Sequence, residues 1–430
     1  MSNYTISNQE PKGTRDWFPE EFLIRKYIFD TWRQVCLKYG FEEYLTPLVE
    51  SAEIYRAKSG EDVGGKELVT FTDLGGRELS IRPEMTPSVT RMVSKIYTAA
   101  PKPLKYFSIA NFMRNEKPQR GRNREFWQLN CDTFGSSSLN ADSEILQLAL
   151  DLMLGFEPPK NSFTLNLSNR KLIDEILSLA LKEIKPEIKI EVVRTLDKWN
   201  KLSAIDFKER LESFGLNKES IEILEQFINS KNLNELAEKL PALKNTLGYL
   251  EIDQVIKDLT DLGYGDYVAF NPAVIRGFDY YDGLVFEVFD NSPDNNRAMF
   301  GGGRYNGLAE IFGSVSFPAV GFAIGDETTR LFLESWGLIE KMKNSQPARY
   351  YLPLLDAKLS AELRLLTKNL RRAGQNIIMG LEEQKIGKAL EYANKNKIAQ
   401  VIIFGADEKA KGIYKIKNMM SGQEEEKKLN

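Results

Sequence analysis

The sequence of 430 residues contains no histidine. Without an imidazole, the chain has no histidine general base, no histidine proton shuttle, no serine-histidine triad and none of the usual histidine metal ligands. Any catalysis must therefore come from charge, from positioning or from carboxylates.

Cysteine is almost as scarce, since only Cys36 and Cys131 occur. Two cysteines are too few for a disulfide framework or a cysteine zinc site. The N-terminus carries no apolar signal region, and no run of about 18 apolar residues follows it. We therefore expect a protein without membrane segments in a reducing cytoplasm.

An excess of positive charge is also missing, because the formal net charge is -3. This value excludes a uniformly basic nucleic-acid coat, although it leaves room for a local basic groove. Hydrophobic residues make up 42% of the chain and charged residues 28%, as is usual for a globular protein. The length suffices for two or three domains.

Hydrophobic periodicity divides the chain into four parts. Residues 1–170 alternate apolar runs with helical patterns and resume as strand-like, glycine-rich sequence over 263–340, so we expect one α/β unit interrupted by an insertion. Residues 171–262 are rich in Leu, Glu, Lys and Ile at helical spacing and predict a helical insertion. Regular alternation over 348–430 predicts a small, separate α/β domain.

Finer features carry further expectations. Strands are predicted over Leu104–Arg114 and Arg124–Phe134. They are joined by a loop in which Pro118 and Gly121 interrupt regular secondary structure. Asp326 is a candidate N-cap for the helix that it begins. The charged tail from Ser421 is expected to fray.

The strand Arg124–Phe134 has two different faces. Residues two apart share a face, so Trp127, Leu129 and Cys131 point to one side, and the other side carries Gln128, Asn130 and Asp132. An isolated strand with a polar face is more often simply solvated than functional. The arginines beside it favour a function: Arg114, Lys117, Arg120, Arg122 and Arg124. Several guanidinium groups on one loop suit a triphosphate or an RNA backbone, although a solvated run of charge is the plainer alternative.

Three more segments combine groups that could hold a ligand. Arg276 to Gly283 offers an arginine beside paired tyrosines, which suits a small zwitterion, whereas a plain turn explains the spacing equally well. Gly301 to Tyr305 allows close backbone approach but has neither P-loop nor dinucleotide-site spacing, and glycine clusters are usually turns. Ile81 to Thr86 supplies a carboxylate and a hydroxyl, with N-capping by Thr86 as the alternative.

Taken in order, these segments resemble the histidyl-tRNA synthetase family of class II aminoacyl-tRNA synthetases over nearly the whole chain. Phe41 to Glu50 is similar to the first class motif, Asn111 to Phe134 to the second and Pro318 to Leu333 to the third. The Arg-Gly-Phe-Asp-Tyr-Tyr segment at 276–281 is the most specific match. The resemblance implies an α+β fold: an antiparallel sheet flanked by helices, a helical insertion and a C-terminal α/β anticodon-binding domain.

The resemblance also implies ATP-dependent attachment of L-histidine to tRNA(His) through a histidyl-adenylate, with Mg²⁺ and a homodimer. ATP would be bound by Arg114, Glu116, Arg122 and Phe126. Histidine would be bound by Glu84, Met85, Thr86, Gln128, Asp132, Arg276, Tyr280, Tyr281 and Tyr305. Arg276 and Arg114 would be catalytic, and Gln119 and Arg120 would contact the acceptor end of the tRNA. The resemblance gives no protein ligands for the metal.

Some residues depart from the family pattern. Thr328 stands where the third motif carries an arginine for the γ-phosphate, Met85 replaces a glycine, and Asp132 replaces the usual glutamate. Two alternatives remain. The regulatory subunit of ATP phosphoribosyltransferase shares the fold but would be expected to lack both the 276–281 segment and the last domain. A threonine or proline synthetase would lack the Arg276 segment.

Overall fold

The computed structural model describes residues 7–57, 59–60, 62–181, 186–199, 202–275, 280–293, 295, 298–313, 315–344 and 347–429. These residues form two compact units, Met1–Ile339 and Glu340–Asn430. Each unit has its own sheet. Among the described residues, no helix combines the length and the apolar character that crossing a bilayer would require.

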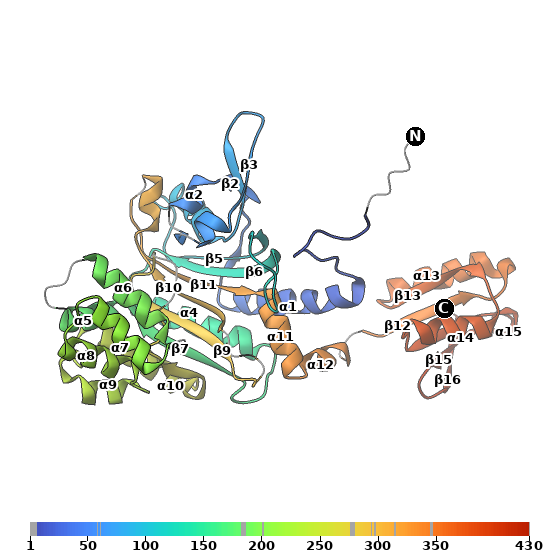
Figure 1. Cartoon of the computed structure of the whole chain (residues 1–430). Helices are drawn as coiled ribbons and strands as arrows, with labels where there is room; N and C mark the ends of the chain where they lie inside the picture. The colour runs from blue at the N-terminus through green and yellow to red at the C-terminus, as the bar shows by residue number, and fades with distance from the viewer. Residues whose placement is uncertain are drawn as a thin grey trace. The chain divides into compact units, whose positions relative to one another are not determined.

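The first unit is built on an eight-stranded sheet (Figure 1). Its strands are antiparallel except at the two edges, where β1 pairs with β5 and β8 with β7 in parallel. In spatial order the strands are β1 (Glu42–Glu43), β5 (Leu104–Met113), β6 (Glu125–Phe134), β11 (Ala319–Gly325), β10 (Ala298–Tyr305), β9 (Leu284–Asp290), β7 (Phe163–Asn169) and β8 (Val268–Phe270). The two long strands β5 and β6 confirm the predicted pair.

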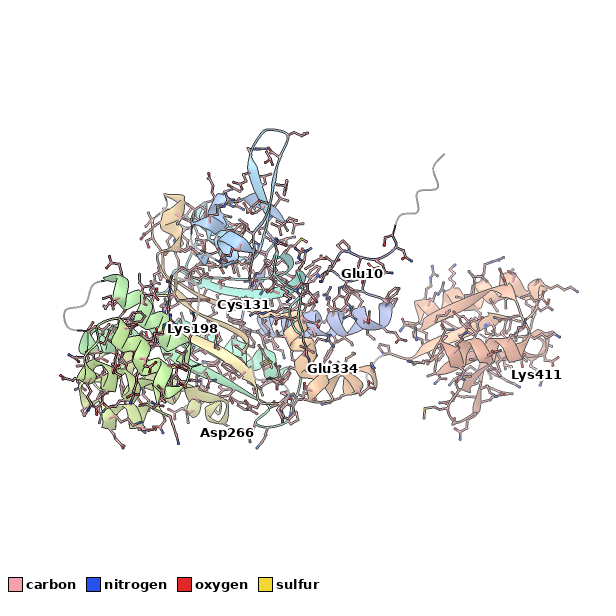
Figure 2. The ribbon with its side chains drawn as sticks, in the orientation of Figure 1. Glu10, Cys131, Lys198, Asp266, Glu334 and Lys411 are labelled. Carbon is pink, nitrogen blue, oxygen red and sulfur yellow. The ribbon has the colours of Figure 1, made fainter. Side chains whose placement is uncertain are left out.

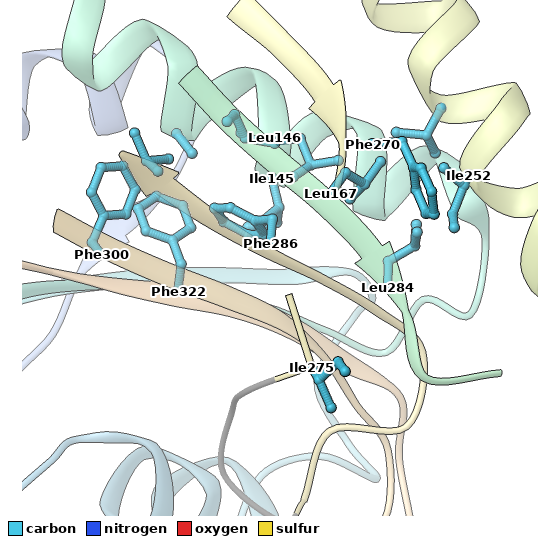
Figure 3. Close-up of a cluster of buried hydrophobic side chains, with 14 of the residues drawn as sticks. Ile145, Leu146, Leu167, Ile252, Phe270, Ile275, Leu284, Phe286, Phe300 and Phe322 are labelled. Carbon is cyan, nitrogen blue, oxygen red and sulfur yellow. The ribbon is translucent and has the colours of Figure 1, made fainter. Parts of the chain in front are cut away.

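One face of this sheet packs against helices and forms the main core. Figure 3 shows apolar side chains of strands β7, β9, β10 and β11 meeting Ile145 and Leu146 of α4 and Ile252 of α10. Leu129 and Cys131 of β6 belong to the same cluster, and the Sγ atom of Cys131, labelled in Figure 2, lies 3.5 Å from that of Cys36. The helices on this face are α1 (Pro19–Lys38), α4 (Leu139–Leu154), α10 (Leu247–Asp261) and α11 (Asp326–Ser335).

The helix α11 does not use Asp326 as its N-cap, so that expectation was wrong. Gly325 occupies the cap position, and Asp326 is the first helical residue. Its buried carboxylate forms an ion pair of 2.6 Å with Arg25 of α1 and accepts a hydrogen bond from the backbone N–H of Trp127. A buried charge needs a paired and hydrogen-bonded partner, and tertiary structure supplied one that local spacing cannot show.

The opposite face of the sheet carries a second, smaller core around α3 (Thr86–Ser94). Beside it lie the short helix α2 (Glu53–Arg56) and a three-stranded sheet, in which β4 (Glu78–Ile81) pairs with both β2 (Val49–Ser51) and β3 (Val69–Thr72). This layer stands above β5 and β6 in Figure 1. It brings the turn after β4 over the polar face of β6.

The segment between β7 and β8 is helical in its described part, as the periodicity indicated. It contains α5 (Arg170–Ala180), α6 (Pro186–Asp197), α7 (Ala204–Ser213), α8 (Lys218–Ile228), α9 (Leu233–Lys239) and α10. Asn169, Ser203, Asn217 and Asn232 each cap the helix that follows with a side-chain oxygen. Such caps satisfy backbone N–H groups that the first turn leaves free.

The second unit is a five-stranded sheet with helices. Its order is β13 (Asn376–Glu383), β12 (Arg349–Leu354), β14 (Gln400–Ile403), β15 (Ile413–Asn418) and β16 (Glu424–Lys428), with α13 (Ser360–Arg372), α14 (Ile386–Lys395) and α15 (Ala406–Lys411) between strands. The expectation of a frayed tail was wrong, because β16 pairs with β15 in antiparallel register. An ion pair of 2.9 Å between Lys417 and Glu424 joins the two strands.

Candidate functional site

The polar face of β6 forms the floor of a cavity. Gln128, Asn130 and Asp132 line it, while Leu129 and Cys131 lie in the main core on the other face. The predicted division of the two faces is therefore confirmed, and the alternative of a simply solvated polar face does not hold. The cavity has a volume of about 190 Å³.

Segments far apart in sequence complete the cavity. Glu84 and Thr86 come from the turn after β4, Arg114 follows β5, and Tyr280 and Tyr281 precede β9. The remaining lining residues belong to the adjacent strands β10 and β11: Gly301, Tyr305, Gly321, Phe322 and Ala323. Eight of the predicted residues thus share one space: Glu84, Thr86, Arg114, Gln128, Asp132, Tyr280, Tyr281 and Tyr305.

Asp132 is the buried carboxylate at the far end of the floor. The hydroxyl of Tyr305 donates a 2.6 Å hydrogen bond to Oδ1, and Oδ2 has no hydrogen-bond partner among the described residues. Burial raises the pKa of Asp132 to about 7, with a smaller contribution from the charge of Glu84, while the bond from Tyr305 opposes the shift. A buried carboxylate with a free oxygen favours a ligand that brings a hydrogen-bond donor or a positive charge.

Glu84 is a second buried carboxylate on the cavity wall. Burial raises the pKa of Glu84, whereas the positive charge of Arg114 and a 3.3 Å hydrogen bond from the hydroxyl of Tyr280 favour its ionised form. Its turn is held by Arg82, whose Nη1 donates to the carbonyl of Thr46 at 2.8 Å and whose Nε donates to that of Asn111 at 2.9 Å. Two carboxylates in one small cavity are suited to an ammonium group.

The other two residues of this turn behave differently from each other. Thr86 is the first residue of α3, and no side chain caps that helix, so the N-capping alternative is wrong. Met85 is fully buried in the smaller core, where its Sδ accepts a hydrogen bond from the hydroxyl of Thr46 at 3.2 Å. Met85, predicted to contact histidine, is not among the residues that line the cavity.

Arg114 stands at the opposite end of the floor from Asp132. Its Nε donates to the carbonyl of Pro83 at 3.0 Å, and its guanidinium lies 5.1 Å from the ring centre of Phe126. The ring of Phe126 stacks on Phe112, with centres 5.8 Å apart. Phe126 is outside the cavity lining but beside its arginine. A guanidinium and a half-buried aromatic ring side by side are suited to a phosphate and a planar base.

The loop between β5 and β6 extends away from this cavity. Arg122 forms a 3.4 Å ion pair with Glu116, and backbone hydrogen bonds join Gln119 to Arg122 in both directions. Gln119 and Arg120 are exposed at the tip. None of these four residues lines the cavity, so the loop could only reach a ligand that extends out of it.

The third motif leaves its γ-phosphate contact open. Thr328 donates to the carbonyl of Gly325 at 3.0 Å, as a helix side chain does at the start of a helix. Arg330, two residues further along the helix, forms ion pairs with Glu327 at 2.8 Å and Glu334 at 3.1 Å. The nearest arginine to the usual position is therefore already paired within its own helix.

Two sequence expectations concern segments around β9 and β10. Arg276 lies outside the described residues, so its proposed roles have no structural description. The Gly301–Tyr305 segment is part of β10 and not a turn. Its Arg304 binds Asp142 of α4 with a shortest distance of 2.6 Å and is not among the residues that line the cavity.

Sequence reasoning missed several lining residues. Asn130 was placed on the polar face of β6 but was not assigned to the site, although the same alternation indicates it. Gly321 carries no local signal: a Cβ there would lie 2.1 Å from Oδ1 of Asp132, so only glycine leaves room for that carboxylate. The contact depends on the register between β11 and β6.

A metal site built from protein ligands is not evident in the described part of the chain. It contains no group of three or more His, Cys, Asp or Glu residues that could hold an ion. Mg²⁺ usually keeps several waters and binds through one or two carboxylates together with substrate phosphates.

Comparisons with known proteins show which family the chain resembles over nearly its full length. A family model described as histidyl-tRNA synthetase matches residues 13–328, and one described as an anticodon binding domain matches residues 347–430. A histidine--tRNA ligase of Leptospira biflexa is 40% identical, covering 98% of this chain and 95% of the relative. One of Pyrococcus horikoshii is 38% identical, covering 97% and 96%.

Solved structures show the same fold. The crystal structure of histidyl-tRNA synthetase from Nostoc sp. PCC 7120 matches with a TM-score of 0.83 and 23% identity, over 99% of this chain and 97% of the other. A Bacillus halodurans structure titled as an ATP phosphoribosyltransferase regulatory subunit/histidyl-tRNA synthetase matches with a TM-score of 0.72 and 21% identity, over 88% and 94%. From the family match to residues 13–328 and the relatives matched over nearly their full length, this chain belongs to the histidyl-tRNA synthetase family.

Proposed function

We propose that this chain activates L-histidine with ATP and attaches it to tRNA(His). The observation that carries the proposal is the cavity in which two buried carboxylates, Glu84 and Asp132, face Arg114 and a group of tyrosines. A zwitterionic amino acid with a polar ring suits such a lining, and its carboxylate suits the arginine end. The family to which the chain belongs uses ATP.

In the first step, the carboxylate of histidine attacks the α-phosphorus of ATP, and pyrophosphate leaves. Negative charge builds on the phosphoryl oxygens, so fixed positive charge aimed at them lowers the barrier. We assign this role to Arg114, from its position at the end of the cavity opposite Asp132, and to Arg276, from the sequence resemblance. Mg²⁺, when bound to the phosphates, would supply further positive charge.

The remaining ATP contacts are proposed from the loop and strand beside Arg114. Phe126 would stack on adenine, and Glu116 and Arg122 would lie along the nucleotide. The assignment of Phe126 is supported by the half-buried position of its ring beside Arg114. In the second step, a ribose hydroxyl of the tRNA attacks the carbonyl of the adenylate and releases AMP. Gln119 and Arg120, exposed at the loop tip, would contact the acceptor end.

The histidine contacts are proposed for both ends of the cavity. Glu84, Thr86 and Gln128 would bind the ammonium group, and Asp132 with Tyr280, Tyr281 and Tyr305 would bind the ring. The rings of Tyr280 and Tyr305 are 5.6 Å apart, and this close pair supports an apolar wall for the imidazole. Met85 would act from the core, by packing beneath this wall.

We also propose a homodimer formed through the segment 41–50. Leu45 is 69% exposed and Leu48 41% exposed, and both lie beside the edge strand β1. A solvent-facing apolar segment at a sheet edge favours burial against a second copy. Sedimentation of the wild type and of Leu45→Glu tests this: a wild-type monomer would exclude the dimer.

The compartment is proposed to be the cytoplasm, and residues 348–430 are proposed to bind the anticodon.

Histidine-dependent exchange of pyrophosphate into ATP tests the activity. We expect exchange with histidine and none with threonine or proline. Exchange with another amino acid but not with histidine would show that the chain is a synthetase for that amino acid. No exchange at all would favour the regulatory-subunit alternative. The match of residues 347–430 to an anticodon binding domain counts against that alternative.

A further inference from the structure

Asn130 occupies the centre of the cavity floor. It is 2% exposed and lies on β6 between Gln128 and Asp132, which the proposed function assigns to the two ends of the amino acid. Alternate residues on one strand are about 7 Å apart, so Asn130 lies within reach of a molecule that spans both neighbours. No role for Asn130 follows from the contacts described so far.

The amide of Asn130 is not used by the fold. Its Oδ1 is buried and has no hydrogen-bond partner among the described residues. Buried polar atoms in folded proteins nearly always have a partner, because an unsatisfied one loses the hydrogen bonds that water would supply. A buried acceptor that faces a cavity and lacks a partner therefore indicates a partner that enters the cavity.

Strand register keeps the space above Asn130 open. Its neighbours in the same row of the sheet are Ser108 on β5, Ala323 on β11 and, one strand further, Gly301 on β10. Cross-strand neighbours point to the same face, and all three have smaller side chains. Asn130 is thus the longest side chain in its row across these four strands, and a ligand on the floor would meet it first.

We propose that Asn130 determines amino-acid specificity by accepting a hydrogen bond from a ring N–H of the bound substrate through Oδ1. The proposal rests on the proposed function, since it takes the ligand to be an amino acid with a nitrogen-containing ring. Asp132 and Asn130 would then present two acceptors to the ring, one charged and one neutral. A pocket built to hydrogen-bond a substrate group rejects analogues without that group, because its buried acceptor is left unsatisfied.

The test is a cycle between a side-chain change and a ligand change, measured by calorimetric binding to the full chain. The ligands are L-histidine, β-(4-thiazolyl)alanine and β-(5-thiazolyl)alanine, in which sulfur replaces one ring nitrogen or the other and the remaining ring nitrogen carries no proton. We expect Asn130→Ala to weaken histidine binding by about tenfold. Binding of both thiazole isomers should change by less than about threefold, since neither carries a ring N–H that Oδ1 could accept.

Matched controls separate a ligand contact from a structural effect. Thr133→Val changes a buried residue on the same strand but on the face away from the cavity, and it should leave all three affinities unchanged. The KM for ATP should stay within about twofold of wild type in Asn130→Ala. Asn130→Ser, which keeps a small polar side chain that cannot reach as far, should show the same loss and serves if the alanine variant does not fold.

Two results would overturn the proposal. Unchanged histidine affinity in both Asn130 variants would exclude a contact, and an equal loss for histidine and both thiazole isomers would exclude the ring N–H as the partner. Failure of the proposed function gives a different result, because the wild type itself would then show no histidine-dependent exchange.

Discussion

The hydroxyl of Tyr305 on β10 donates a 2.6 Å hydrogen bond to Oδ1 of Asp132 on β6, reaching across the intervening strand β11. The bond can pass only because position 321 is glycine, where a Cβ would lie 2.1 Å from the same oxygen. Three strands thus determine which oxygen of Asp132 stays available. Oδ2 is the one left for a ligand.

Tyr305→Phe should weaken histidine binding without affecting ATP. Loss of a hydrogen bond to a carboxylate costs about 1.5–3 kcal/mol, and a freely rotating Asp132 would present its oxygens less favourably. We expect the KM for histidine in the exchange reaction to rise about tenfold or more. Tyr249→Phe, a buried tyrosine on α10 behind the sheet, is the control and should match the wild type. An unchanged KM in Tyr305→Phe would show that the bond does not orient Asp132.

Asp132→Asn should stabilise the protein without ligand, and more so at high pH. Burial raises the pKa of Asp132 from 3.8 to about 7. Between these values the folded chain keeps a proton that the unfolded chain has lost, so the contribution of Asp132 to the free energy of unfolding decreases as the pH rises. Asparagine has no charge to bury. The melting temperature of Asp132→Asn should exceed that of the wild type by about 2 °C or more at pH 8 and by less at pH 5. An equal difference at both pH values would argue against the raised pKa.

Arg114 is expected to act on the chemical step more than on binding of histidine. Arg114→Gln removes a fixed charge from the arginine end of the cavity, so single-turnover adenylation should slow by about 10²-fold or more. Arg114→Lys keeps the charge but loses the planar fork, and an intermediate rate is expected. Arg77→Gln, whose exposed arginine pairs with Asp73, is the control. If Arg114→Gln alters only the affinity for histidine, the phosphate role is wrong.

Arg276 lies outside the described residues, and its role is predicted from the sequence resemblance. Arg276→Ala should lose most of the activation rate with only a modest loss of histidine binding, because the charge acts on the developing negative charge of the transition state. Rapid-quench measurement of adenylate formation checks this. Near-normal single-turnover rates would refute the role.

The ion pair between Arg25 and Asp326 should be important for stability. Both side chains are buried, and their 2.6 Å contact joins α1 to α11. Asp326→Ala leaves the arginine charge without its partner, so we expect a loss of about 3–5 kcal/mol in the free energy of unfolding. Urea denaturation followed by tryptophan fluorescence can measure this loss, since the guanidinium carbon of Arg25 lies 3.5 Å from the ring centre of Trp17. Glu21→Ala breaks an exposed pair with Arg15 and should cost less than about 1 kcal/mol.

Much of the fold could be predicted from the sequence because its signals are local. Alternation along residues 125–134 separated the core face of β6 from its polar face, and helical spacing identified the insertion. Leucine-rich periodicity and turn residues depend on a few neighbouring positions. They therefore indicate helices, strands and turns even when the rest of the fold is unknown. The tail after Ser421 was missed because its charged residues give no apolar pattern, and its strand exists only through pairing with β15.

The sequence by itself determined the residue types of the site, their order and the face of β6 on which Gln128, Asn130 and Asp132 lie. Only the tertiary structure decided what each of them meets. It put Met85 in the core, gave Asp326 a partner on α1, left the amide of Asn130 free and raised the pKa of Asp132. The physical reason is that burial and hydrogen-bond partners depend on the register of strands distant in sequence, and local periodicity carries no information about that register.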